Sequence, residues 1–208
     1  MNRAVLVVIV LAGILAGAAA GFVFTRARDT PPALERATLF ETPRPLPAFA
    51  LVDHAGEAYE RDRLRGRWTF LFFGFVNCPD VCPTTLATLA DARRSVMDLP
   101  PGERPHVVLA SVDPARDRPE VLARYVGHFD PSFTGITGSA ESIEALTRDL
   151  GVAVIVGPAA LDGSYTVDHS AAIFLIDPEA RLTAVFGTPH ESAAIARDYR
   201  RIVAAQPG

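Results

Sequence analysis

Short apolar runs alternate with helical stripes along most of this chain of 208 residues. The clearest run covers residues 68–76, which are aromatic and branched, as expected of a strand buried on both faces. The spacing of the apolar positions then changes to a helical stripe over residues 86–96. We therefore expect a strand, a loop that contains Cys78 and Cys82, and a helix that begins near the second cysteine.

The same alternation continues to the end of the chain. Residues 48–59 predict a hairpin that turns at Gly56. Asp117 and Thr188 each precede a proline and a glutamate, so each is expected to cap a helix. Further strands are expected at residues 106–112, 133–137, 152–156, 171–176 and 182–186, and a further helix at residues 139–150. This order predicts an α/β domain, with a central mixed sheet flanked by helices, and the cysteine loop makes it look thioredoxin-like.

An uncharged segment of about twenty residues, 4–24, is long enough to cross a membrane as a helix. The alanines at 18–20 resemble a signal-peptide cleavage site, but the apolar stretch continues through Phe24. We therefore favour an uncleaved transmembrane helix over a cleaved signal. Arginines on both sides determine the orientation poorly, although a short tail with one arginine commonly stays inside the cytoplasm.

Proline and charged residues dominate residues 25–47, which predicts an extended tether without a core of its own. The chain is thus divided into an N-terminal membrane anchor at 1–25, a tether at 26–46 and a folded domain at 47–208.

Composition restricts the class of function. The chain has 20 Lys and Arg against 24 Asp and Glu, so no basic excess points to a nucleic-acid partner. Two cysteines are too few for a disulfide-built scaffold. Their spacing alone allows a redox pair, a metal site or a structural disulfide, and the surrounding residues must decide.

Paired thiolates with an imidazole suit Cu(I) better than Mg²⁺ or Ca²⁺, which prefer oxygen ligands. Because Cys82 stands at a helix start, the helix dipole is expected to favour its thiolate. His169 precedes the strand at 171–176, whose entry lies beside the cysteine loop in thioredoxin-like folds. Taken alone, a histidine at a strand edge is more often a packed or hydrogen-bonded side chain. Asp168 either orients an imidazole or caps a turn. Surface or structural positions are expected for His54, His106, His128 and His190.

Four motifs together are similar to the signature of the Sco/SenC copper chaperones. They are FGFVNCPDVCP at 73–83, SVDPARD at 111–117, TGITG at 134–138 and YTVDHS at 165–170. The resemblance covers essentially everything from Pro47 to Tyr199. It implies a thioredoxin-like fold and a copper site, for Cu(I) or Cu(II), with Cys78, Cys82 and His169 as ligands.

The resemblance also implies a function, namely delivery of copper to the binuclear copper site of cytochrome c oxidase subunit II. The protein would be a single-pass protein of the bacterial inner membrane with its soluble domain in the periplasm. Other periplasmic copper chaperones or thiol oxidoreductases are further expected partners.

The main alternative is a thiol-disulfide oxidoreductase or redox sensor that uses Cys78 and Cys82. Three residues between the cysteines instead of two, and Asp168 and His169 where thioredoxins carry a proline, favour metal binding. A peroxiredoxin-like peroxidase is a third, less favoured interpretation. Enzyme activity is therefore expected only if the pair exchanges thiols.

Overall fold

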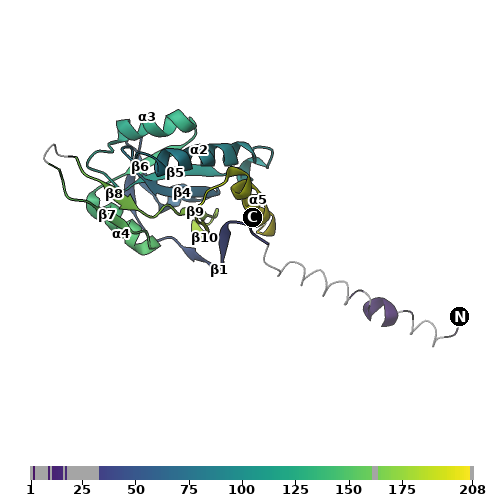
Figure 1. Cartoon of the computed structure of the whole chain (residues 1–208). Helices are drawn as coiled ribbons and strands as arrows, with labels where there is room; N and C mark the ends of the chain where they lie inside the picture. Colours follow the sequence, from purple (N-terminus) through teal and green to yellow (C-terminus); the bar gives the residue numbers. More distant parts are fainter. Residues whose placement is uncertain are drawn as a thin grey trace.

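The computed structural model describes residues 2, 9, 11–15, 17, 33–160 and 164–206. Ten strands form an eight-stranded sheet, in the order β1-β10-β9-β4-β5-β6-β2-β3, and a separate hairpin of β7 and β8. Helices α2 and α3 lie on one side of the sheet and α4 on the other (Figure 1). The strands are β1 Ala37–Pro45, β2 Ala50–Asp53, β3 Ala58–Glu60, β4 Thr69–Gly74, β5 His106–Ser111, β6 Thr134–Thr137, β7 Val154–Val156, β8 Val167–His169, β9 Ile173–Ile176 and β10 Arg181–Phe186. The helices are α2 Val81–Arg94, α3 Pro119–Phe129, α4 Ala140–Leu150 and α5 Ser192–Ala205, with short 3-10 turns at Arg61–Leu64 and Pro101–Glu103.

Strand β4 is the centre of the fold and is buried along its whole length. It pairs parallel with β5 and antiparallel with β9, so the sheet is mixed, as predicted. Phe70, Phe72 and Phe73 are at most 1% exposed. Burial of each such side chain contributes roughly 1.5–3 kcal/mol. This packing fixes the end of β4, from which the cysteine loop starts.

Most predicted elements are present, with shifted ends. The hairpin turn at Gly56 is confirmed, with a φ of 85° that suits glycine. Helix α5 begins at Ser192 rather than near Thr188. The predicted cap at Asp117 is wrong, because Arg118 occupies the N-cap of α3 and no side chain caps that helix. The sequence predicts no strand at β8, which lies just before the predicted strand at 171–176.

The folded domain begins earlier than the sequence predicts. Residues 37–45, assigned to the tether, form β1, which pairs with β10 at the edge of the sheet. Leu46 is 2% exposed, so it belongs to the core. An edge strand tolerates the prolines at 43 and 45 because one side of it needs no ladder hydrogen bonds. Of the rest of the predicted tether, residues 33–36 lead into β1, and residues 26–32 lie outside the described residues.

The predicted anchor at residues 4–24 also lies largely outside the described residues. Within the described part of the chain, no helix has the length and apolar character needed to span a membrane.

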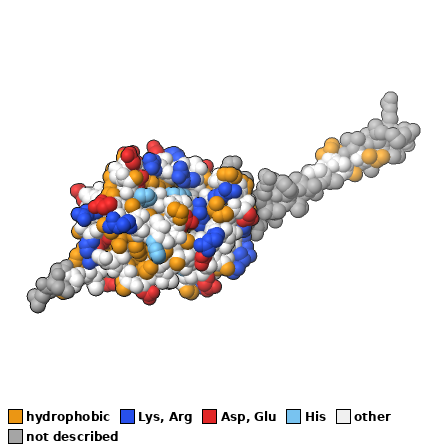
Figure 2. All heavy atoms as spheres, turned by 90° about the horizontal axis from the view of Figure 1, so that it is seen from above, with side chains coloured by type: hydrophobic (Ala, Val, Ile, Leu, Met, Phe, Trp, Pro, Cys, Tyr) orange, Lys and Arg blue, Asp and Glu red, His pale blue; other side chains and the backbone are white. Residues whose placement is uncertain are grey.

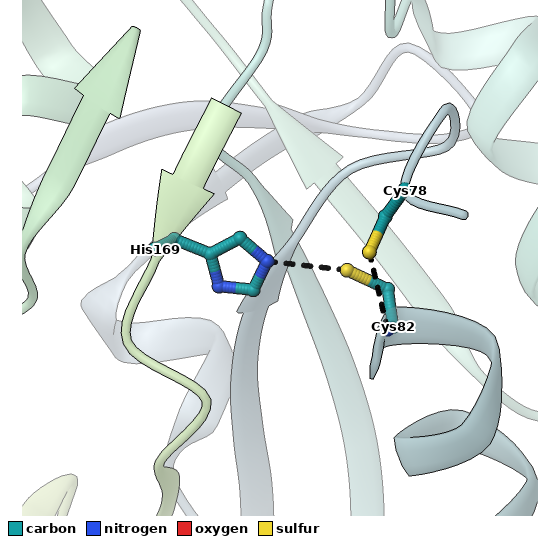
Figure 3. Close-up of side chains that lie close together, drawn as sticks. All are labelled: Cys78, Cys82 and His169. Atoms are coloured by element: carbon teal, nitrogen blue, oxygen red, sulfur yellow. Dashed lines mark hydrogen bonds between the residues drawn. The ribbon is translucent and has the colours of Figure 1, made fainter. Parts of the chain in front are cut away.

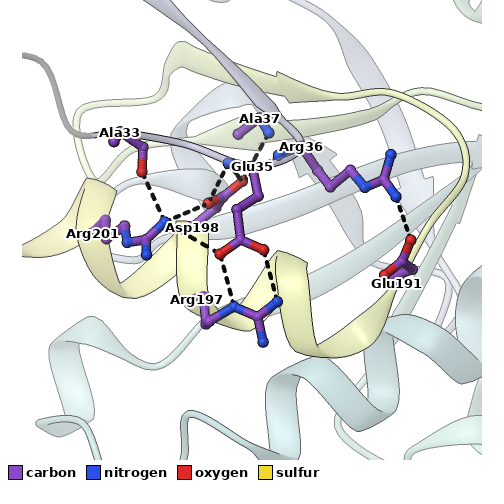
Figure 4. A network of polar contacts seen from close by, with 8 residues as sticks. All are labelled: Ala33, Glu35, Arg36, Ala37, Glu191, Arg197, Asp198 and Arg201. Atoms are coloured by element: carbon purple, nitrogen blue, oxygen red, sulfur yellow. Dashed lines mark hydrogen bonds and ion pairs between the residues drawn. The ribbon is translucent and has the colours of Figure 1, made fainter.

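The first described residues of the domain are held by helix α5 (Figure 4). Asp198 is fully buried, and its carboxylate accepts backbone N–H groups from Glu35, Arg36 and Ala37 at 2.7–3.0 Å. Arg197 donates two hydrogen bonds to the Glu35 carboxylate at 2.9 and 2.7 Å. These contacts join residues more than 160 positions apart and fix where the chain enters the domain.

We expect Asp198→Asn to lower the free energy of unfolding by about 2–4 kcal/mol, because charge-assisted bonds to a buried carboxylate are lost. The NH₂ group of the asparagine would also face backbone N–H groups, and two donors cannot form a hydrogen bond with each other. Urea unfolding followed by circular dichroism measures the change, with Asp91→Asn as the control at an exposed ion pair. Equal stabilities of the two variants would contradict this role of Asp198.

Candidate metal centre

Three elements bring the predicted ligands together (Figure 3). Cys78 lies in the loop after β4, Cys82 in the first turn of α2, and His169 at the end of β8. Gly74, at the end of β4, makes this approach possible, because a Cβ there would stand 3.1 Å from the Cys82 sulfur. A side chain at that position would press α2 away from the sheet.

One donor atom from each of the three residues lies within 4.8 Å of the other two. The Cys82 sulfur is 3.2 Å from His169 Nε2, and the Cys82 backbone N–H donates to the Cys78 sulfur at 3.3 Å. Both cysteines are free thiols, with Cys82 fully buried and Cys78 9% exposed. Cys78 and His169 border an open cavity of about 290 Å³. Within the described ranges, this is the one group of three or more such side chains placed to hold a metal ion.

The imidazole of His169 is fixed in the orientation that a metal ligand needs. Its Nδ1 donates to the backbone carbonyl of Ser170 at 3.0 Å, which leaves the Nε2 lone pair directed at the cysteines. The rings of Phe72 and Phe75 pack edge-on against it, with centroids 6.0 and 5.8 Å away. The carboxylate of Asp168 is exposed and makes no hydrogen bond to a described residue, so this side chain neither orients His169 nor caps a turn in this structure.

Burial raises the pKa of the Cys82 thiol, and the hydrogen bond with Cys78 raises it further. The expectation that the helix dipole favours thiolate at Cys82 is therefore wrong for the metal-free site. Desolvation of the charged sulfur outweighs the dipole. The thiol proton is available to His169 Nε2, and a metal ion must displace it to bind sulfur.

Asp117 supports the cysteine loop, although the sequence pattern predicts that it caps a helix. Asp117 is fully buried and accepts from the Val76 backbone N–H at 3.0 Å and the Ser111 hydroxyl at 2.7 Å. It thereby ties the loop to the end of β5. Sequence reasoning missed this role, and the only available signal was the position of Asp117 in the SVDPARD motif.

A second support reaches the hairpin that carries His169. The Arg116 guanidinium pairs with Asp113, stacks 3.7 Å from the centroid of the Tyr165 ring and donates to the Tyr165 carbonyl at 3.2 Å. The Tyr165 hydroxyl donates to Asp113 at 2.6 Å. Asp113 therefore does more than mark the end of a strand, because it helps to hold the approach to β8.

The other histidines are surface or structural, as predicted. His54 accepts from the Gly135 N–H at 2.9 Å, His106 pairs with the Thr134 hydroxyl at 2.9 Å, and His190 pairs with the Thr85 hydroxyl at 3.2 Å. His128 is exposed at the end of α3. None of the four belongs to the cluster at the cysteines.

Two sulfurs and one imidazole form a soft donor set. Such a set matches copper, and in particular Cu(I), better than the oxygen-seeking cations. Three protein ligands also leave a coordination position open toward the cavity. The donor set and its place beside the cavity therefore fit a bound soft metal ion.

Comparison with known proteins agrees with this geometry. The family described as SCO1/SenC matches residues 37–204. "Protein SCO2 homolog, mitochondrial" of Mus musculus is 37% identical over 76% of this chain and 62% of its own length. The "Putative copper-binding protein" of Stutzerimonas stutzeri is 36% identical over 78% of this chain and 80% of its own.

A solved structure shares the fold as well. The crystal structure of Arabidopsis thaliana ScoI with copper bound is 33% identical, covers 75% of this chain and 96% of that chain, and has a TM-score of 0.70. The predicted thioredoxin-like architecture, a central mixed sheet with flanking helices, is thus confirmed. The chain spans about three fifths of the length of the mitochondrial relatives that it matches. On the match over residues 37–204 and the likeness of sequence and structure, the chain belongs to the SCO1/SenC family.

Proposed function

We propose that this protein binds one copper ion through the sulfurs of Cys78 and Cys82 and Nε2 of His169, and delivers it to the binuclear copper site of cytochrome c oxidase subunit II. The observation that carries the proposal is the convergence of three soft donors within 4.8 Å beside an open cavity. The copper-bound plant relative and the copper-binding bacterial relative support the choice of metal.

Transfer of the ion requires that an incoming ligand binds before the last protein ligand leaves. Cys82 is fully buried, whereas Cys78 and His169 border the cavity and are partly accessible. Val81, between the cysteines, is 38% exposed and offers an apolar contact at the rim. An acceptor thiolate would thus reach the ion on the side of Cys78 and His169, and Cys82 would release it last.

A test of the delivery step uses the copper-loaded protein and the apo form of a soluble subunit II domain. Wild type is expected to transfer its copper, as measured by the metal content of the separated proteins. A chain with Thr84→Ser, a change of one methyl group in the first turn of α2, serves as the matched control. Retention of all copper by a wild-type chain that binds it would overturn delivery to this acceptor while leaving copper binding intact.

Oxidation of the cysteine pair is expected to abolish copper binding. A Cys78–Cys82 disulfide forms when an oxidant accepts two electrons and two protons from the thiols, and a disulfide no longer offers the thiolate donors. Copper content after desalting should fall below about one tenth of the reduced protein's and return on reduction. Thiol titration is the control, and full copper retention by a thiol-free chain would contradict the prediction.

We also propose that residues 4–24 anchor the protein in the inner membrane with its domain in the periplasm, which the apolar length of the segment supports. Anchoring raises the local concentration of the donor near a membrane-embedded client. The protein should remain in the membrane fraction, and protease added from the periplasmic side should cut it. A soluble form that begins near Gly21 would refute the anchor.

A thiol-disulfide oxidoreductase remains the alternative function. Thiol exchange needs an accessible thiolate, whereas Cys82 is fully buried and its burial raises the pKa of its thiol. These features favour metal binding over exchange. Reduction of a disulfide substrate at catalytic rates by the metal-free protein would reverse this preference.

A further inference from the structure

A second hollow lies at the end of the sheet opposite the metal centre. The cysteine loop follows the carboxyl end of β4, whereas this hollow adjoins the turn before the strand, where Arg67 lies. It has a volume of about 390 Å³. The end of α2 and the segment that leads into β5 form its other walls.

Three arginines line this hollow, and few acceptors face them. Arg93 pairs with Asp130 at 3.2 Å and donates to the Pro105 carbonyl. Arg104 donates to the Leu99 carbonyl through Nε alone, at 2.9 Å. Among the described residues, Arg67 has no hydrogen-bond or ion-pair partner. The terminal nitrogens of Arg104 and the whole guanidinium of Arg67 are therefore available to a ligand.

Two carboxylates near the hollow are already engaged. Asp130 is held by Arg93 and also accepts the backbone N–H and hydroxyl of Ser132. Both oxygens of Asp98 accept hydrogen bonds from Arg200, which lower the pKa of this carboxyl, and the nearby charge of Arg104 lowers it further. These two carboxylates therefore do not neutralise Arg67 and Arg104, and the hollow is positively charged although the whole chain has a net charge of −4.

The histidine in the wall responds to this charge. Burial, together with the positive charges of Arg67 and Arg93, lowers the pKa of His106 to about 4. Its Nε2 is held by the Thr134 hydroxyl at 2.9 Å. The imidazole is neutral near pH 7, so the arginines supply the charge of the hollow.

Guanidinium groups match the geometry of phosphate and carboxylate oxygens, because they donate paired hydrogen bonds in a plane. We propose that this hollow is a binding site for a phosphate group, held by Arg67 and Arg104 with the field of Arg93 behind them. The site is separate from the copper ligands, and the proposal does not depend on the function proposed above.

Helix α5 connects this site to the point where the chain enters the domain. The Tyr199 hydroxyl donates to the Glu103 carbonyl, next to Arg104, and Arg201 donates to the Ala33 carbonyl at 2.8 Å. A single helical turn thus contacts both the rim of the hollow and the first described residue of the domain. Basic and acidic side chains are interspersed on the face of the domain that Figure 2 shows. A phospholipid headgroup near the proposed anchor and a free phosphate are the two sources of such a group.

The test uses calorimetric titration of the full chain, in neutral detergent micelles, with inorganic phosphate. Wild type should bind saturably, and Arg67→Gln/Arg104→Gln should bind at least about tenfold more weakly. The control is Arg118→Gln/Arg124→Gln, which removes the same charge from exposed positions around α3 and should change affinity less than about twofold. The single variant Arg67→Gln removes no hydrogen bond or ion pair to a described residue, so the variant is expected to stay folded, and circular dichroism checks this.

Mixed micelles then distinguish the sources. If the natural group is a lipid headgroup, phosphatidylglycerol should weaken phosphate binding by wild type and phosphatidylcholine should not. Phosphate binding that depends on the arginines but is indifferent to both lipids assigns the site to a free phosphate. The proposal is overturned if wild type shows no saturable binding, or if both double variants lose it equally.

Discussion

Replacement of either cysteine by serine is expected to weaken copper binding by about 10²–10³-fold. Metal-binding free energies of about 10–16 kcal/mol in small four-ligand zinc sites correspond to roughly 2.5–4 kcal/mol for each ligand, and each 1.4 kcal/mol is about tenfold in affinity. Serine keeps the size of cysteine but offers a hydroxyl, which does not ionise at neutral pH. Cys78→Ser and Cys82→Ser should both show the loss, because the two sulfurs belong to one donor set.

Competition with a chromophoric Cu(I) chelator measures this change. Thr84→Ser is the matched control, because Thr84 lies in the same first turn of α2 as Cys82 and contributes no ligand. Circular dichroism must show that the Cys82 variant stays folded, since Cys82 is fully buried. Wild-type affinity in both cysteine variants would exclude the sulfurs as ligands.

The second large effect is expected for His169→Ala. Loss of one nitrogen donor should weaken copper binding by about 10²-fold, by the same partition of free energy among ligands. The effect should be larger for Cu(II) than for Cu(I), because Cu(II) prefers nitrogen and oxygen donors whereas the remaining thiolates still suit Cu(I). The variant should therefore shift the preference of the site toward Cu(I).

His128→Ala is the matched control for this variant, because His128 is exposed and lies outside the metal cluster. Titrations of both variants with each oxidation state, under anaerobic conditions for Cu(I), give the four affinities required. Equal copper affinities of the His169 and His128 variants would show that the imidazole contributes no ligand.

The sequence predicts the central strand and the cysteine helix well because local pattern decides them. Residues 70–74 are apolar without interruption, and the stripe that follows has helical spacing. Strand β1 could not be predicted in this way, because its prolines favour an extended tether and only pairing with β10 makes it a strand. Local composition therefore fails where a long-range partner determines the structure.

In the candidate site, too, local patterns in the sequence predict some residues, and contacts between distant residues determine the others. The cysteine pair stands out in the sequence by itself, whereas His169 is recognised only through the resemblance of its motif, since it lies 87 residues from Cys82. The supports of the site were missed for a related reason. Asp117 bonds to Val76 across 41 residues, and Ser170, rather than the neighbouring Asp168, fixes the imidazole through its backbone carbonyl. Backbone carbonyls leave no signature in the sequence.

The most direct test of the copper site is X-ray absorption at the copper edge on the full chain loaded with one equivalent of Cu(I). The structure predicts two sulfur neighbours and one nitrogen neighbour, with one sulfur lost in Cys78→Ser and the nitrogen lost in His169→Ala. A copper ion surrounded by nitrogen and oxygen alone, or a spectrum that neither substitution changes, would contradict the account.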